Sequence, residues 1–103
     1  NIINKETLSL MKDTAMFINV GRGNAVNEDD LIKALNSGQI ACAALDTTKI
    51  EPLPSQSGLW NANNCYISPH DSAHSLHAII RMNALFCENL LNIINEKPIK
   101  NLI

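Results

Sequence analysis

Short apolar runs alternate along the chain with longer segments in which apolar residues recur every three or four positions. A short apolar run bounded by glycine or proline is typical of a buried strand, and the longer spacing is typical of an amphipathic helix. We therefore predict strands at residues 15–20, 40–45 and 65–68 and helices at residues 4–12, 28–37 and 75–96. Buried strands that alternate with helices indicate an α/β fold with a parallel sheet.

The ends of these elements carry start and stop signals. Asn4 and Asn27 are suited to cap the first two helices, and Gly38 follows the second. Pro69 ends the third strand, and Pro98 ends the last helix. These signals agree with the boundaries that the apolar pattern predicts.

The long loop and the last helix have patterns of their own. Residues 47–64 contain two prolines, a glycine and several asparagines, which predicts an ordered loop with one helical turn near Leu59 and Trp60. The apolar positions of the last helix are Leu76, Ile79, Ile80, Phe86, Leu90, Leu91 and Ile94. Their spacing predicts that one face of this helix is apolar.

Three polar side chains come shortly after the predicted strands. Arg22 follows the first strand, Asp46 the second and His70 the third. Ligands bind beyond the carboxyl ends of parallel strands, so we expect these side chains to share one edge of the sheet. Arg22 lies between two glycines and is suited to clasp a carboxylate, although an ordinary surface arginine in a turn would look the same. Asp46 either contacts a ligand or caps the next turn.

Glu51 and His70 form a candidate acid/base pair, each beside a proline. A carboxylate that accepts from one imidazole nitrogen sets the tautomer and leaves the other nitrogen to exchange a proton. The alternative is a solvated glutamate and an unrelated loop histidine. A zinc site at His70, His74 and His77 is not predicted, because His70 precedes the helix and no HExxH motif is present.

Composition excludes several classes of protein. The chain has 103 residues, of which 46% are hydrophobic and 17% charged, with a net charge of −2. This is a globular composition without a nucleic-acid footprint, and no apolar run approaches the ~20 residues of a membrane helix. We expect three buried free thiols and a reducing, cytoplasmic location from the cysteines, which are Cys42, Cys65 and Cys87.

Several motifs stand in a definite order along the chain. They are MKDTAMFINVGRG at residues 11–23, AALD at 43–46 with EPLP at 51–54, LW at 59–60 leading to SPH at 68–70, and NLLNIINEKPIKN at 89–101. Together they resemble the D-isomer-specific 2-hydroxyacid dehydrogenases from end to end of the chain. The resemblance implies the second half of a Rossmann-type, doubly wound parallel sheet with a long C-terminal helix.

The resemblance also implies roles for individual residues. Arg22 matches the arginine that binds the substrate carboxylate, His70 matches the general acid, and Glu51 matches its carboxylate partner. Asp46 matches a residue near the nicotinamide carboxamide of the cofactor. The backbone positions that match the nicotinamide site are Asn19, Val20 and Gly21.

The chain departs from the family pattern in places. Ala73 stands where the family often has glycine, and Thr47 and Thr48 stand where it usually has an aliphatic and an aromatic residue. No G-x-G-x-x-G motif is present. We therefore interpret residues 1–103 as the C-terminal half of a dinucleotide-binding domain with its C-terminal helix, and as a piece of a longer chain, since it begins with Asn1.

The resemblance implies an NAD- or NADP-dependent oxidoreductase of small 2-oxo and 2-hydroxy acids, homodimeric when intact. The alternative is a module that resembles transcriptional corepressors of the same fold and binds a protein in an NAD-dependent manner without turnover. We expect the 103-residue chain alone to be inactive, because the phosphate-binding half of the cofactor domain is missing.

Overall fold

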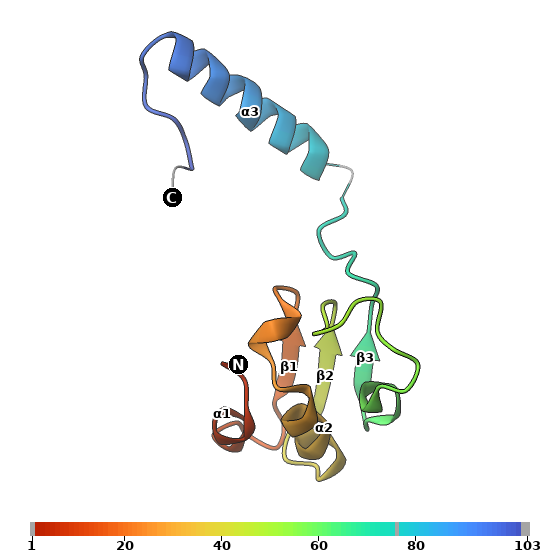
Figure 1. Ribbon diagram of the computed structural model, residues 1–103. Coiled ribbons are helices and arrows are strands. Elements are labelled where there is room, and N and C mark those ends of the chain that lie inside the picture. Colours follow the sequence, from red (N-terminus) through yellow and green to blue (C-terminus); the bar gives the residue numbers. More distant parts are fainter. Residues whose placement is uncertain (1, 76, 102–103) are drawn as a thin grey trace. The chain divides into compact units, whose positions relative to one another are not determined.

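The computed structural model describes residues 2–75 and 77–101, which fall into two compact units, Asn1–Ser72 and Ala73–Ile103 (Figure 1). The elements of the first unit are α1 (Lys5–Ser9), β1 (Met16–Asn19), the 3-10 helix η1 (Gly23–Ala25), α2 (Glu28–Asn36), β2 (Cys42–Leu45), the 3-10 helix η2 (Gly58–Asn61) and β3 (Cys65–Ile67). The second unit contains α3 (Ala78–Ile94).

The three strands form a parallel sheet in the order β1-β2-β3 (Figure 1). The register aligns Ile18 with Ala44 and Ala44 with Tyr66, so these side chains share one face of the sheet. That face is open within the first unit, because Ile18 and Tyr66 are both exposed. The predicted α/β fold with a parallel sheet is therefore confirmed, and each strand is shorter than predicted.

The core lies between the other face of the sheet and the helices. Its buried apolar members are Leu8, Val26, Leu31, Ala34, Leu35, Ile40, Ala43, Leu45 and Leu59. Leu31, Ala34 and Leu35 lie three or four positions apart on α2, so they form the apolar stripe that this helix buries. This packing fixes the strands and, with them, the positions of their carboxyl ends.

Asn4 and Asn27 cap the first two helices, as the sequence predicts. The Asn4 side chain accepts from the backbone N–H of Glu6 and Thr7 at the start of α1, which is shorter than predicted. The Asn27 side chain accepts from the Asp30 N–H at the start of α2. Gly38 adopts a φ of 73° just after α2, a conformation that glycine reaches without a steric penalty.

The second unit contains α3 and the segments that flank it. No described residue of α3 is buried, and its exposed apolar side chains include Ile79, Ile80, Phe86, Leu90, Leu91 and Ile94. Leu76, which the sequence pattern also places on the apolar face, lies outside the described residues. None of the described helices combines the length and apolarity needed to cross a membrane.

The expectation of three buried thiols was wrong. Cys42 and Cys65 are half-buried and Cys87 is exposed; all three are free. Cys87 lies on α3, which has no buried side chain among the described residues, so its apolar neighbours do not shield it. Partial burial, with a smaller contribution from the charge of Glu28, raises the pKa of the Cys65 thiol.

Candidate functional site

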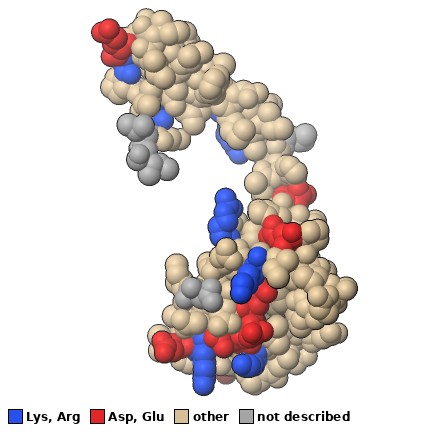
Figure 2. All heavy atoms as spheres, viewed as in Figure 1, with Lys and Arg blue, Asp and Glu red and all other residues tan. Residues whose placement is uncertain are grey.

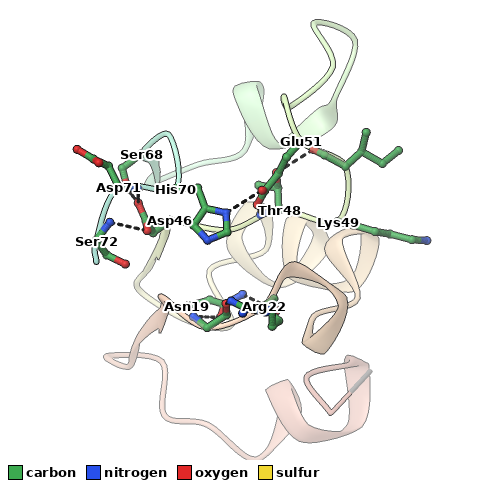
Figure 3. Close-up of polar contacts among 12 residues, drawn as sticks. Asn19, Arg22, Asp46, Thr48, Lys49, Glu51, Ser68, His70, Asp71 and Ser72 are labelled. Atoms are coloured by element: carbon green, nitrogen blue, oxygen red, sulfur yellow. Dashed lines mark hydrogen bonds and ion pairs between the residues drawn. The ribbon is translucent and has the colours of Figure 1, made fainter. Parts of the chain in front are cut away.

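The carboxyl ends of the three strands bring together the side chains that the sequence singles out. Arg22 lies in the turn after β1, Asp46 follows the last residue of β2, and His70 lies in the turn after β3. Figure 3 shows these residues near one another, with Glu51 beside His70. Parallel pairing of the strands places them there, as predicted.

The His70 imidazole faces the Glu51 carboxylate. Nδ1 of His70 lies 2.7 Å from Oε2 of Glu51, and both side chains are partly exposed (Figure 3). The other oxygen of Glu51 accepts from the Thr48 N–H at 3.0 Å. The contact with His70, and then the Thr48 N–H, hold the pKa of Glu51 below its ordinary value. Since Nδ1 faces the carboxylate, proton exchange with a ligand falls to Nε2 of His70.

Asp46 binds the turn that carries His70. Its carboxylate accepts from the Ser68 hydroxyl at 2.6 Å and from the backbone N–H of Asp71 at 2.9 Å and of Ser72 at 2.8 Å. These bonds hold the pKa of Asp46 well below its ordinary value. Asp46 is buried. Its carboxylate makes several hydrogen bonds to the turn after β3, and the sequence did not indicate these bonds.

The turn that carries Arg22 is shaped by Asn19. The buried Asn19 side chain accepts from the Gly21 N–H and donates to the Arg22 carbonyl, both at 3.1 Å. Nη1 of Arg22 donates to the Gly21 carbonyl at 2.8 Å. From the sequence, Asn19 is assigned only a backbone role in cofactor binding. Its position two residues before a glycine turn is the signal that an Asx-type bond was available.

The Arg22 turn packs tightly against the loop after β2. A Cβ atom added to Gly23 would lie 2.1 Å from the carbonyl carbon and oxygen of Thr48, which leaves no room for a side chain. Thr48 in turn donates its N–H to Glu51. This contact links the arginine turn to the histidine–glutamate pair. The sequence identifies the glycine at position 23, but it does not indicate that Thr48 packs against it.

Two hollows meet at this edge. A small one of ≈ 170 Å³ is lined by Arg22, Gly23, Asn24, Thr47, Thr48, Lys49, Glu51 and His70. A larger one of ≈ 700 Å³ has walls from Leu53, Trp60 and Ile67 and also reaches His70. The small hollow is well below the ~300 Å³ at which drug-sized ligand sites begin, so its size suits a molecule of a few heavy atoms.

A third hollow lies on the open face of the sheet. It measures ≈ 430 Å³ and is lined by residues that include Ile18, Val20, Ala44, Asp46 and Ser72. Apolar side chains form one wall, and the Asp46 carboxylate and Ser72 lie beside it. Apolar walls with a few polar groups are typical of small-molecule sites.

The described residues contain no group of three histidine, cysteine or carboxylate side chains arranged to hold a metal ion. His70 belongs to the first unit, and His74 and His77 belong to the second. The chemistry that the described geometry supports is therefore that of an arginine and an imidazole–carboxylate pair around a small hollow.

Comparison with known proteins shows the family of this chain. The profile of the D-isomer specific 2-hydroxyacid dehydrogenase NAD binding domain matches residues 1–72. The chain belongs to this family. The family is the one that the sequence motifs resemble, so that resemblance is confirmed.

Individual members of the family support the assignment. The human glyoxylate reductase/hydroxypyruvate reductase is 43% identical over 97 residues, which cover 94% of this chain and 30% of that protein. The crystal structure of a D-isomer specific 2-hydroxyacid dehydrogenase from Xanthobacter autotrophicus Py2, in complex with NADPH and MES, matches 99% of this chain and 41% of its own, with a TM-score of 0.86 and 37% identity. The D-lactate dehydrogenase of Lactobacillus jensenii, solved with NAD+, matches 100% and 35%, with a TM-score of 0.78 and 25% identity.

The matched region is a limited part of these relatives. The chain spans about a third or less of the length of the curated relatives it matches. Its fold is that of part of a Rossmann-type dehydrogenase domain.

Proposed function

We propose that this chain supplies the proton-transfer and carboxylate-binding residues of an NAD(P)-dependent dehydrogenase that acts on a small 2-oxo or 2-hydroxy acid. The observation that carries the proposal is the His70–Glu51 pair, 2.7 Å apart, in one small hollow with Arg22. Membership of the family supports the same activity, and the human relative is named a glyoxylate reductase/hydroxypyruvate reductase.

Each residue of the small hollow has a part in the proposed reaction. The Arg22 guanidinium binds the carboxylate of the oxo acid through two hydrogen bonds and orients its carbonyl group. Nε2 of His70 donates a proton to the carbonyl oxygen as the carbonyl carbon is reduced, and takes it back in the reverse direction. Glu51 holds the ring by Nδ1 and leaves Nε2 to exchange the proton.

The cofactor side of the site lies on the open face of the sheet. A bound nicotinamide cofactor supplies the hydride chemistry. We assign Val20 and Asp46 to its ring and carboxamide because both line the hollow on that face. The backbone of Asn19 and Gly21 would flank the same position at the end of β1. The chain contains no G-x-G-x-x-G motif, so we assign the cofactor phosphates to another part of an intact protein.

A single substitution tests the role of His70. In the full-length protein that carries this chain, oxidation of NADH and NADPH is followed with glyoxylate and hydroxypyruvate. We expect His70→Ala to lower kcat by about 10²- to 10⁴-fold, the usual contribution of a general acid. His77→Ala is the matched control, because His77 is the N-cap of α3 and lines none of the three hollows described above.

The result is decisive in both directions. Near-normal turnover of the His70→Ala protein would remove His70 from the reaction. Absence of turnover in the unaltered protein, with a partner protein bound in a cofactor-dependent way, would favour a binding module instead. No specific feature of the described residues favours that alternative.

A further inference from the structure

We propose that Asp46 is a positioning residue, beyond any contact with a cofactor, and that it holds the His70 imidazole against Glu51 by binding the turn on both sides of His70. The catalytic consequence of this role rests on the proposed function above. The positioning itself is a property of the fold and is open to a separate test.

The contacts of Asp46 bracket His70 in the sequence. Oδ1 accepts from the hydroxyl of Ser68, two residues before His70, and from the N–H of Asp71, the residue after it. Oδ2 accepts from the N–H of Ser72 (Figure 3). One buried carboxylate thus joins three points of a five-residue turn whose central residue is the histidine.

The His70 backbone requires such support. Its φ is 56°, in the left-handed region that residues other than glycine seldom adopt. A backbone of this kind persists where surrounding contacts determine it. The left-handed conformation also sets the direction in which the imidazole leaves the chain, and therefore its approach to Glu51. Release of the turn would allow His70 to relax and the 2.7 Å contact to open.

Asp46 is itself firmly anchored. Its N–H donates to the Asn19 carbonyl at 2.9 Å, and the Ser68 N–H donates to the Leu45 carbonyl at 2.9 Å. Both bonds continue the sheet beyond the ends of the strands. A site held by a sheet is more precise than one held by a loop alone, so Asp46 transmits the rigidity of β2 to the turn after β3.

The role needs a carboxylate rather than an amide. Donors of Ser68, Asp71 and Ser72 converge on the two oxygens of Asp46, and an asparagine would turn one oxygen into an N–H donor that faces another donor. Asp46→Asn therefore keeps the size of the side chain but breaks at least one of the hydrogen bonds to the turn that carries His70. Ser68→Ala removes one of these hydrogen bonds and leaves the charge of Asp46 unchanged.

Carbon-13 NMR titration of the 103-residue chain measures the pKa of the Glu51 carboxyl. This pKa distinguishes a positioning role of Asp46 from an effect of its charge alone. The contact with His70 is the largest influence that lowers this pKa, whereas the charge of Asp46 raises it. Positioning predicts that Asp46→Asn shifts the pKa of Glu51 upward, toward its ordinary 4.5, because the His70 contact is lost. A charge effect alone predicts a downward shift.

Two further variants complete the experiment. Ser68→Ala should move the pKa of Glu51 upward by a smaller amount, and it decides the question if Asp46→Asn does not fold. Asp30→Asn is the matched control, since Asp30 also accepts from a backbone N–H, that of Lys5, but is not among the groups that shift the pKa of Glu51. An unchanged or lowered pKa of Glu51 in every variant that folds would overturn the proposal.

Kinetics of the full-length protein provide an independent readout. Positioning predicts that Asp46→Asn lowers kcat by about 10- to 100-fold, the scale of a small misplacement of a reacting group. A rise in KM for the cofactor with kcat unchanged would mean that Asp46 acts through the cofactor alone and would overturn the proposal. The NMR titration needs no turnover, so failure of the proposed function and failure of the positioning role give different results.

Discussion

Buried polar side chains decide the local geometry of the site at the scale of single residues. Asn19 shapes the turn of Arg22, and Asp46 binds the turn of His70. Both are buried at the ends of strands, where every hydrogen-bonding group needs a partner. Each side chain accepts hydrogen bonds from backbone N–H groups of its turn, and these groups would otherwise be unsatisfied.

Thr47 is the exception among these buried polar residues. Among the described residues, its hydroxyl has no hydrogen-bond partner, although the side chain is 2% exposed. An unsatisfied buried hydroxyl costs about 1–3 kcal/mol. We therefore expect Thr47→Val to raise the free energy of unfolding by about 1 kcal/mol in urea denaturation.

A second threonine provides the control for this substitution. The Thr7 hydroxyl accepts from the Asn4 N–H and donates to backbone carbonyls at the start of α1. Thr7→Val should lower stability by about 1 kcal/mol, the ordinary value of such bonds. Destabilisation by Thr47→Val as well would show that the Thr47 hydroxyl has a partner in solution.

Stability should depend on pH through the same residues. The pKa values of Asp46 and Glu51 are both lowered in the folded state, so their contribution is fully present above the ordinary values of 3.8 and 4.5. It is lost as the pH falls below about 4.5 toward the lowered values. We expect the urea midpoint to fall between about pH 5 and pH 3, and to fall less steeply in Asp46→Asn. An equal slope in both proteins would contradict this account.

Close backbone packing matters at the scale of elements. The turn after β1 leads into η1 through Gly23, and this turn lies against the loop after β2 with no space for a side chain. The strands determine which edge the loops occupy. The glycine determines how near the arginine turn can come to Thr48 and Glu51.

Two glycines of the same turn provide a matched test. Gly23→Ala should lower stability by about 2 kcal/mol or more, because its Cβ would lie 2.1 Å from Thr48 and the backbones must move apart. Gly21→Ala should be tolerated within about 1 kcal/mol, because the nearest atom to its Cβ, Oδ1 of Asn19, is 3.6 Å away. Urea denaturation of both variants measures the difference. Equal effects would contradict the packing argument.

The chain divides into two units at the scale of the whole molecule. Among the described residues, the buried apolar core runs from Leu8 to Leu59 and lies in the first unit. On the face shown in Figure 2, charged side chains gather over the first unit, and the surface of α3 is largely uncharged. Exposed apolar side chains on α3 and on the open face of the sheet are typical of surfaces that are covered in a larger assembly.

A shortened chain tests whether the first unit is self-sufficient. We expect a chain that ends at Ser72 to keep a cooperative unfolding transition, because every residue of its core is retained. Trp60 reports on the transition by fluorescence, since it lies in the first unit and its Nε1 donates to the Pro54 carbonyl. A gradual, non-cooperative change of fluorescence would show that the second unit is needed for folding.

Much of the fold was predictable because its signals are local. Apolar runs, the caps Asn4 and Asn27, and Gly38 follow from spacing and backbone preference. The exposure of the apolar side chains of α3 was not predictable. An apolar face indicates that a helix packs against something, but it does not show where the packing partner lies. The homodimer and the extent of the domain remain predictions.

The order of the motifs by itself determined the family, and the sequence pattern pointed to the candidates Arg22, Glu51 and His70. Only the tertiary structure decided which side chains hold these candidates in place. Asp46 and Ser72 are far apart in the chain, and so are Gly23 and Thr48, yet each pair is in contact or close approach. Such pairs depend on how the parallel strands pair and pack, because residues far apart in the chain come together only when the sheet is assembled.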